Sequence, residues 1–299
     1  MQDTLSQPGN PFAVPGHWYK AALHTHTSLS DGMRSPEEVA AWYRGHGFQV
    51  LALTDHNLRA EVDGLNGPDF LTIPGAELHP GRTELGEPYH LVAIGIGRTH
   101  AYTAQDSVQE AIDALRADGA VVWLAHPYWL GVTLPEIVAL RGIIGLEVYN
   151  ATCEEYAKGL STVHWDDALA RRYPCWGLAV DDAHWYRPDY GRGWVMVRAP
   201  ELTTEAILRA LAAGHFYASQ GPEIHAVEVT SERVYVRCSP ACRISCVSLC
   251  GYGGPAAVPG PDGLLTEAAF PRRQMRVYVR LECTDAAGRT AWSQPIMID

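Results

Sequence analysis

From about residue 20 to residue 222, short apolar runs alternate with amphipathic helical patterns, and this alternation limits the fold more than any other feature. Short buried runs are typical of strands, and an apolar period of 3.6 residues is typical of helices. Ser35-Pro36-Glu37-Glu38 predicts a helix start, because serine caps, proline suits the first helical position and acids favour the first turn. The segment therefore predicts β/α alternation. We expect strands at residues 20–26, 50–54, 70–77, 90–95, 120–125, 145–149, 176–180 and 194–198, and helices at 36–45, 106–116, 134–140, 165–172 and 204–213.

The pattern changes after about residue 222. Val227, Val229, Val234 and Val236 alternate with polar residues, apolar runs follow at 244–249, 275–283 and 294–298, and Gly- and Pro-rich stretches such as 251–263 separate them. This predicts a small antiparallel, sandwich-like all-β domain. We therefore divide the chain into an α/β domain at 1–222 and a β domain at 223–299.

The charge balance restricts the partners. The chain has 299 residues and a formal charge of −11, which argues against an extended nucleic-acid surface. An anionic small substrate still fits if bound cations reverse the local potential. Apolar runs are too short for a membrane span, and residues 1–10 lack the basic start and apolar stretch of a signal peptide, so we expect a cytoplasmic protein without a membrane partner.

Seven cysteines without a signal peptide predict reduced thiols rather than a disulfide framework. Cys238, Cys242, Cys246 and Cys250 are evenly spaced, so a four-thiolate zinc site is one interpretation. Zinc sites of this type usually consist of two close pairs separated by a longer loop, which favours buried structural thiols.

Side chains that can bind metals end most of the predicted strands. His24 and His26 are two residues apart, so on a strand they point to the same face. Alone, such a pair is equally well explained by strand histidines that satisfy local hydrogen bonds. Six strands that all end in this way favour a metal site, and mixed imidazoles and carboxylates suit zinc, manganese or iron. About nine donors exceed the four or five that one zinc ion uses, which predicts two or three divalent ions. The other strand ends carry Asp55-His56, Glu77, His126, Glu147 with Asn150, and Asp181-Asp182 with His184, while His90 begins its strand.

Five ordered motifs resemble those of the PHP (polymerase and histidinol phosphatase) superfamily. They are His-Thr-His-Thr-Ser-Leu-Ser-Asp-Gly, Leu-Thr-Asp-His-Asn, Pro-Gly-Ala-Glu, Ala-His-Pro and Asp-Asp-Ala-His, and the resemblance spans about residues 17–220. Trp-Tyr-Lys before the first motif, Gly-Leu-Glu-Val-Tyr-Asn-Ala-Thr and Gly-His-Phe-Tyr-Ala-Ser-Gln-Gly-Pro-Glu-Ile resemble the branch that includes carbaryl hydrolases. The resemblance implies a distorted (β/α)7 barrel with metals at the carboxyl ends of its strands.

The resemblance also implies roles for individual residues. It assigns a bridging carboxylate to Glu77 and catalytic roles to the metal-binding residues His56, Glu77 and His184. Arg192, in a glycine turn, is a candidate clamp for a phosphate oxygen, although a surface arginine explains it as well. Asp55 and Asp181 are expected to orient imidazoles, whereas surface positions are favoured for His79 and His215, and a surface or supporting position for His164. The metal ligands implied are His24, His26, Asp31, His56, Glu77, His90, His126, Asp182 and His184.

Three functions are compatible with these residues. The first is a phosphoesterase that cleaves a small phosphorylated molecule or nucleotide with a metal-bridging hydroxide. The second is hydrolysis of carboxylic or carbamic esters or amides at the same metals. The third is a metal-binding module without turnover, which the full ligand set disfavours.

Overall fold

The computed structural model describes residues 10–260 and 263–298. The expectation that no signal peptide is present depends on residues 1–9, which lie outside the described residues, as do residues 261–262 of the Gly- and Pro-rich stretch.

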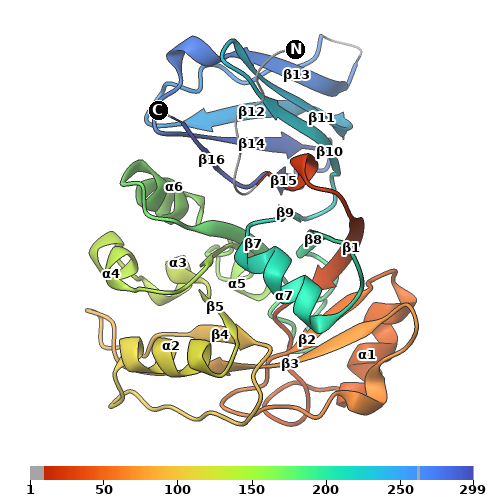
Figure 1. Ribbon diagram of the computed structural model, residues 1–299, viewed down its shortest axis with the longest axis vertical. Helices are drawn as coiled ribbons and strands as arrows, with labels where there is room; N and C mark the ends of the chain where they lie inside the picture. Colours follow the sequence, from red (N-terminus) through yellow and green to blue (C-terminus); the bar gives the residue numbers. More distant parts are fainter. Residues whose placement is uncertain (1–9, 261–262, 299) are drawn as a thin grey trace.

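Seven strands are hydrogen-bonded to one another in chain order and form the centre of the α/β part (Figure 1). The pairs β1–β2, β2–β3, β5–β6 and β6–β7 are parallel, whereas β4 runs antiparallel to both β3 and β5. The chain between β3 and β4 contains no helix, so it turns back beside β3 instead of crossing over. These strands are β1 (His17–Ala22), β2 (Val50–Leu53), β3 (Leu71–Leu78), β4 (Leu91–Ile94), β5 (Val121–Leu124), β6 (Gly145–Asn150) and β7 (Trp176–Val180).

The helices lie in the connections between the strands. The capping box predicted at Ser35 is present, since its side chain accepts from the Glu38 backbone and the Glu38 side chain accepts from the Ser35 backbone. The helices are α1 (Pro36–Gly45), α2 (Val108–Ala117), α3 (Pro127–Leu130), α4 (Leu134–Ala139), α5 (Ala151–Glu154), α6 (Thr162–Ala170) and α7 (Thr204–Ala212), with 3-10 turns η1 (Pro11–Ala13), η2 (Asp63–Leu65) and η3 (Arg272–Gln274).

The segments that follow β1 and β7 meet at one end of the strands. An isolated parallel bridge joins Thr25 to Ala183, and the backbone N–H of Asp182 donates to the carbonyl of His24. The first and last strands of the series are thus drawn together at their carboxyl ends. The predicted mixed α/β architecture is confirmed, and the distorted (β/α)7 barrel stays a prediction.

The C-terminal part consists of β-strands packed in two layers (Figure 1, blue). One sheet continues the central strands, from β1 through β8 (Trp194–Ala199), β9 (Phe216–Ser219), β15 (Thr290–Trp292) and β14 (Tyr278–Thr284) to β12 (Arg243–Ser248), with β16 (Ile296–Met297) beside β14. The other contains β10 (Ile224–Val229), β11 (Arg233–Ala241) and β13 (Leu265–Pro271).

A second hydrophobic core lies in this part, with Val234, Val236, Ile244 and Leu281 all buried. The predicted β region is therefore present. The domain boundary at residue 222 stays a prediction. Backbone hydrogen bonds cross this boundary, because β9 pairs with β15.

All seven cysteines are free, as predicted. Cys238 and Cys246 are buried, but Cys250 is exposed, so the prediction of buried thiols is wrong for that residue. Within the described residues, the groups able to hold a metal ion contain no cysteine. Among the same residues, no helix combines the length and apolar character that crossing a membrane requires.

Candidate metal centre

The loop after β1 presents the first two imidazoles of the site. β1 ends at Ala22 rather than at the predicted His26, so His24 and His26 lie beyond the regular strand. The Thr25–Ala183 bridge keeps this segment extended, so both side chains point to the same face, and both are completely buried.

All nine predicted ligands lie in one cluster, in which four overlapping sets of donor atoms could each hold a metal ion. We call them the inner, outer, His90 and His79 groups. The inner group is His24, His26, Glu77 and Asp182; the outer group is His26, Asp31, His56 and His184; the His90 group is Glu77, His90 and His126; the His79 group is His56, Glu77 and His79.

Glu77 belongs to three of these groups and is 1% exposed. Its Oε1 lies 2.7 Å from Nδ1 of His90 and 3.2 Å from Nε2 of His126. Its Oε2 lies 3.1 Å from Nδ1 of His56 and 3.5 Å from Nε2 of His24. A carboxylate with a different set of imidazoles at each oxygen has the geometry of a bridging ligand.

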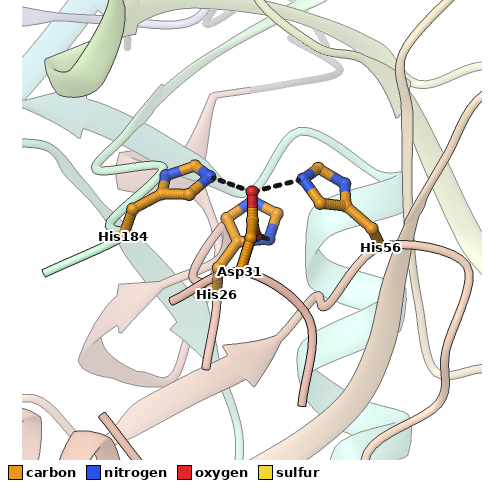
Figure 2. Close-up of side chains that lie close together, drawn as sticks. All are labelled: His26, Asp31, His56 and His184. Carbon is orange, nitrogen blue, oxygen red and sulfur yellow. Dashed lines mark ion pairs between the residues drawn. The ribbon is translucent and has the colours of Figure 1, made fainter. Parts of the chain in front are cut away.

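The outer group opens towards solvent through Asp31, whose side chain is 47% exposed. Figure 2 shows its carboxylate between two imidazoles: Oδ2 lies 3.4 Å from Nε2 of His56 and 3.4 Å from Nε2 of His184. His26 joins the outer and inner groups, since its Nδ1 lies 3.7 Å from Asp31 while its Nε2 lies 3.0 Å from Asp182.

Two residues of the cluster have unusual backbone conformations. His126 has φ 25° and Asp182 has φ 55°, in the left-handed region that favours glycine. Asn150 donates from Nδ2 to Asp182 at 3.1 Å, and Glu147 accepts from the backbone N–H of His126 at 2.9 Å. These buried hydrogen bonds hold both residues in strained conformations of a kind that concentrates at functional sites.

The hydrogen bonds at the rim of the cluster fix which imidazole nitrogens face inward. Because a carboxylate only accepts, Nδ1 of His24 donates to Glu147 at 2.7 Å; likewise Nδ1 of His184 donates to the carbonyl of Asp182 at 2.8 Å. The Nε2 atom of His24 then faces Glu77 at 3.5 Å and Asp182 at 3.3 Å. An imidazole nitrogen that faces two carboxylate oxygens favours positive charge between them, and a divalent metal ion bound by the neutral ring would supply it, so the donor set fits divalent metal ions.

The pKa directions agree with this arrangement. Burial opposes the charged form of His24, but Asp182, Glu147 and Glu77 outweigh burial and raise its pKa well above the usual value. Burial similarly opposes the ionised form of Glu77, yet His90 and His24 hold its pKa well below the usual range. The carboxylate is thus kept ionised, as a ligand must be.

His79 belongs to the cluster, so the surface position favoured for it was wrong. Its ring centroid lies 4.8 Å from that of His56 and 4.2 Å from that of His90, and burial lowers its pKa to about 4. A neutral imidazole is a competent ligand. His79 lies just beyond the end of β3, two residues after Glu77, and this spacing, which places both on one face of an extended segment, was the signal that could have revealed it.

Asp55 and Asp181 hold loops rather than imidazoles. Asp55 accepts from the backbone and hydroxyl groups of both Thr27 and Ser30, and so shapes the turn that leads to Asp31. Asp181 accepts from the Tyr43 hydroxyl and from the backbone N–H groups of residues 191–193. Burial raises the pKa of Asp181 to about 6.

The arginine that lines the cavity is Arg187 rather than the predicted Arg192. A cavity of about 380 Å³ opens over the cluster and is lined by Arg187, Trp129 and Tyr156 among others. Arg187 forms an ion pair with Glu155 across this lining. Arg192 does not line the cavity and donates instead to Glu154 at 2.7 Å. Half-buried His164 in α6 and His215 after α7 also lie outside the cluster.

The fold has a counterpart among solved structures. A crystal structure from Bacteroides vulgatus, of a two-domain protein containing a predicted PHP-like metal-dependent phosphoesterase, matches with a TM-score of 0.56 and 18% sequence identity. The match covers 94% of this chain and 95% of that protein. The chain has a PHP-like fold. The match confirms the PHP-like fold that the ordered motifs predict, while the carbaryl-hydrolase branch stays a prediction.

Two curated proteins match parts of the sequence. An uncharacterized protein of Methanocaldococcus jannaschii is 26% identical over 173 residues, which are 55% of this chain and 65% of that protein. A 5'-3' exoribonuclease of Haemophilus influenzae is 32% identical over 105 residues, which are 33% of this chain and 37% of the enzyme. The matches therefore span less than two thirds of either relative. No family model matches the chain.

Proposed function

We propose that this PHP-like protein is a metal-dependent hydrolase, specifically a phosphoesterase acting on a small phosphorylated molecule or nucleotide. The observation that carries the proposal is that Glu77 is shared by three donor groups beside a cavity of about 380 Å³. Small-molecule sites usually occupy about 300–1,000 Å³. We also propose that the α/β part forms the distorted (β/α)7 barrel and that residues 223–299 form a separate β domain.

Two or three divalent ions, of manganese, iron or zinc, would polarise a phosphate oxygen and supply a water-derived nucleophile near neutral pH. The inner and His90 groups would hold two of them, and Glu77 is a member of both groups. His184 would bind through Nε2, because its Nδ1 already donates to the backbone. Asp31 is the most exposed of the nine predicted ligands and lies where a substrate would enter.

Arg187 would bind a phosphate oxygen of the substrate. Its side chain is 57% exposed and lines the cavity, so it can exchange Glu155 for a substrate anion without losing a buried partner. A guanidinium group matches the oxygens of a phosphate in a bidentate contact. This role replaces the one predicted for Arg192.

The relatives support phosphorus rather than carbon as the centre attacked. The names of both the Bacteroides vulgatus protein and the Haemophilus influenzae enzyme refer to cleavage of phosphoester bonds. A formal charge of −11 and only two lysines favour a small substrate over an extended nucleic acid.

The test is a substrate panel with protein loaded with manganese, iron or zinc and with protein stripped by a chelator. We expect hydrolysis of 4-nitrophenyl phosphate or bis(4-nitrophenyl) phosphate, dependent on about two or three bound ions per chain. His56→Ala should abolish it, whereas His215→Ala, outside the cluster, should not.

Two outcomes would contradict the proposal at different levels. Cleavage of 4-nitrophenyl acetate or 1-naphthyl methylcarbamate without any phosphoester cleavage would leave a metal-dependent hydrolase and refute the phosphoesterase. Full activity of the metal-stripped protein would refute both.

A further inference from the structure

A second concave site lies on the half-exposed face of β1, β8 and β9, away from the metal cavity. Two adjoining hollows of about 420 and 230 Å³ share Trp18, Met196, Tyr217 and Glu223. They therefore form one feature, which we call the β1–β8 groove. None of the residues that line it also lines the cavity over the metal centre.

The groove follows from the alternation of buried and half-buried side chains along the strands. On β8, Trp194, Met196 and Arg198 are half-buried, whereas the intervening Val195 and Val197 are completely buried. In the antiparallel register of β1 and β8, Lys20 lies opposite Met196, and Trp18 lies opposite Arg198. Side chains at paired positions share a face, so indole rings and cations gather together.

Lys20 is a cation held between aromatic rings. Its Nζ lies 4.0 Å from the ring centroid of Phe48 and 4.0 Å from that of Trp194. Across the described parts of the chain, no carboxylate oxygen lies within 4.0 Å of this amine. Burial lowers the pKa of Lys20, which Asp181 only partly opposes, so the charge is poorly compensated.

Arg198 stands over the ring of Trp18, with its guanidinium carbon 5.1 Å from the ring centroid. Its Nε is buried and has no hydrogen-bond partner among the described residues. Arg237 lines the groove from β11, and within residues 10–260 and 263–298 it forms no ion pair. Arg237 is exposed at the groove, so an anionic ligand there could pair with its guanidinium group.

The groove contains little negative charge to balance these cations. Its one carboxylate in the described lining, Glu223, is 68% exposed and lies 3.9 Å from the imidazole of His225. In a chain with eleven more acids than bases, a groove lined by Lys20 and Arg237 without ion-pair partners among the described residues favours anions.

We propose that the β1–β8 groove binds a small planar organic anion of the aromatic carboxylate class. The lining cations Lys20 and Arg237 would attract the anionic group, and the planar part would lie against the indole rings. Flat rings bury apolar surface on indoles at little cost in conformational freedom, and neighbouring cations strengthen the contact.

The test is a titration of the full-length protein with 2-naphthoate, followed through the indole N–H signals of Trp18 and Trp194 by NMR. Each signal is assigned from a Trp→Phe variant. We expect saturable shifts of these signals, and binding about tenfold weaker for the neutral isostere 2-naphthamide, the effect of losing one hydrogen bond to a charged group.

Binding by variants of the groove and by control variants shows where the ligand binds. Lys20→Met keeps the stem that packs on the rings, and Arg237→Gln changes an exposed side chain, so both should fold. Each should weaken binding of 2-naphthoate by about fivefold or more, whereas Arg209→Gln, which changes an exposed side chain of α7, should not. His56→Ala should bind as the unchanged protein does.

Three results would overturn the proposal. They are equal binding of 2-naphthoate and 2-naphthamide, unchanged binding in both groove variants, and loss of the shifts in His56→Ala, which would place the ligand at the metal centre. None of these bears on the phosphoesterase proposal, which is tested by turnover.

Discussion

Glu147→Gln removes the negative charge that orients His24 while keeping the size of the side chain. In the structure, Oε1 of Glu147 accepts from Nδ1 of His24 at 2.7 Å and from Nε1 of Trp123 at 3.1 Å. Oε2 accepts from the backbone N–H of His126 at 2.9 Å and from Nδ2 of Asn150 at 2.9 Å. In either orientation, the new amide NH₂ would face two donors.

The magnitude follows from those contacts. Two buried hydrogen bonds would be lost, each worth about 1–3 kcal/mol, so the free energy of unfolding should fall by about 2–6 kcal/mol. Loss of the group that orients a ligating imidazole typically lowers metal affinity by about 10- to 100-fold. The variant should therefore be both less stable and poorer in metal.

Glu136→Gln is the matched control. Oε1 of Glu136 accepts from the backbone of Glu84 and the hydroxyl of Tyr89, and Oε2 accepts from the backbone and the hydroxyl of Thr133. It thus has two donors on each oxygen, as Glu147 has, but its partners are not metal-binding residues, whereas Glu147 accepts from His24 and His126. We expect it to lose comparable stability and no metal affinity.

The measurements are urea unfolding for stability and competition with a chromophoric chelator for metal affinity. Unchanged metal affinity in Glu147→Gln would refute the orienting role. An equal loss of metal in both variants would show that lower stability alone explains the effect.

Three further predictions concern other residues. Glu77→Ala should lower the bound metal by more than one ion per chain, measured by elemental analysis, because three donor groups share this carboxylate; loss of one ion at most would contradict a bridging role. Arg187→Gln should raise KM for a phosphoester about tenfold and Arg192→Gln should not, since only the former lines the cavity; equal effects would contradict this. Arg280→Met should lower the free energy of unfolding by about 3 kcal/mol, because it strands the bidentate partner Asp166 beside the core; an unchanged urea midpoint would contradict this.

Local signals predicted the secondary structure of the α/β part well. β7 has the predicted bounds, and α1 begins after Ser35 as its capping box requires. Such signals depend on neighbouring residues, which the sequence contains directly. The antiparallel direction of β4 and the pairing of β9 with β15 depend on which distant strand is available, and local patterns do not contain that information.

Convergence of the nine predicted ligands also followed from the sequence, because the ends of adjacent strands meet and the ordered motifs resemble the PHP superfamily. The hydrogen bonds that position those ligands could not be predicted from the sequence. Asp55 holds a turn, and Glu147 holds an imidazole. Both roles depend on the paths of the loops, which hydrogen bonds between distant residues set.

The sequence by itself thus determined the α/β alternation, the β-rich C-terminal part and the donor set of the metal centre. These rest on short-range periodicity and on the chemistry of single side chains. Only the tertiary structure decided that His79 joins the cluster, that Arg187 rather than Arg192 lines the cavity, and that Lys20 lies between aromatic rings. Each depends on the distance between residues far apart in the chain, which packing of the whole molecule sets.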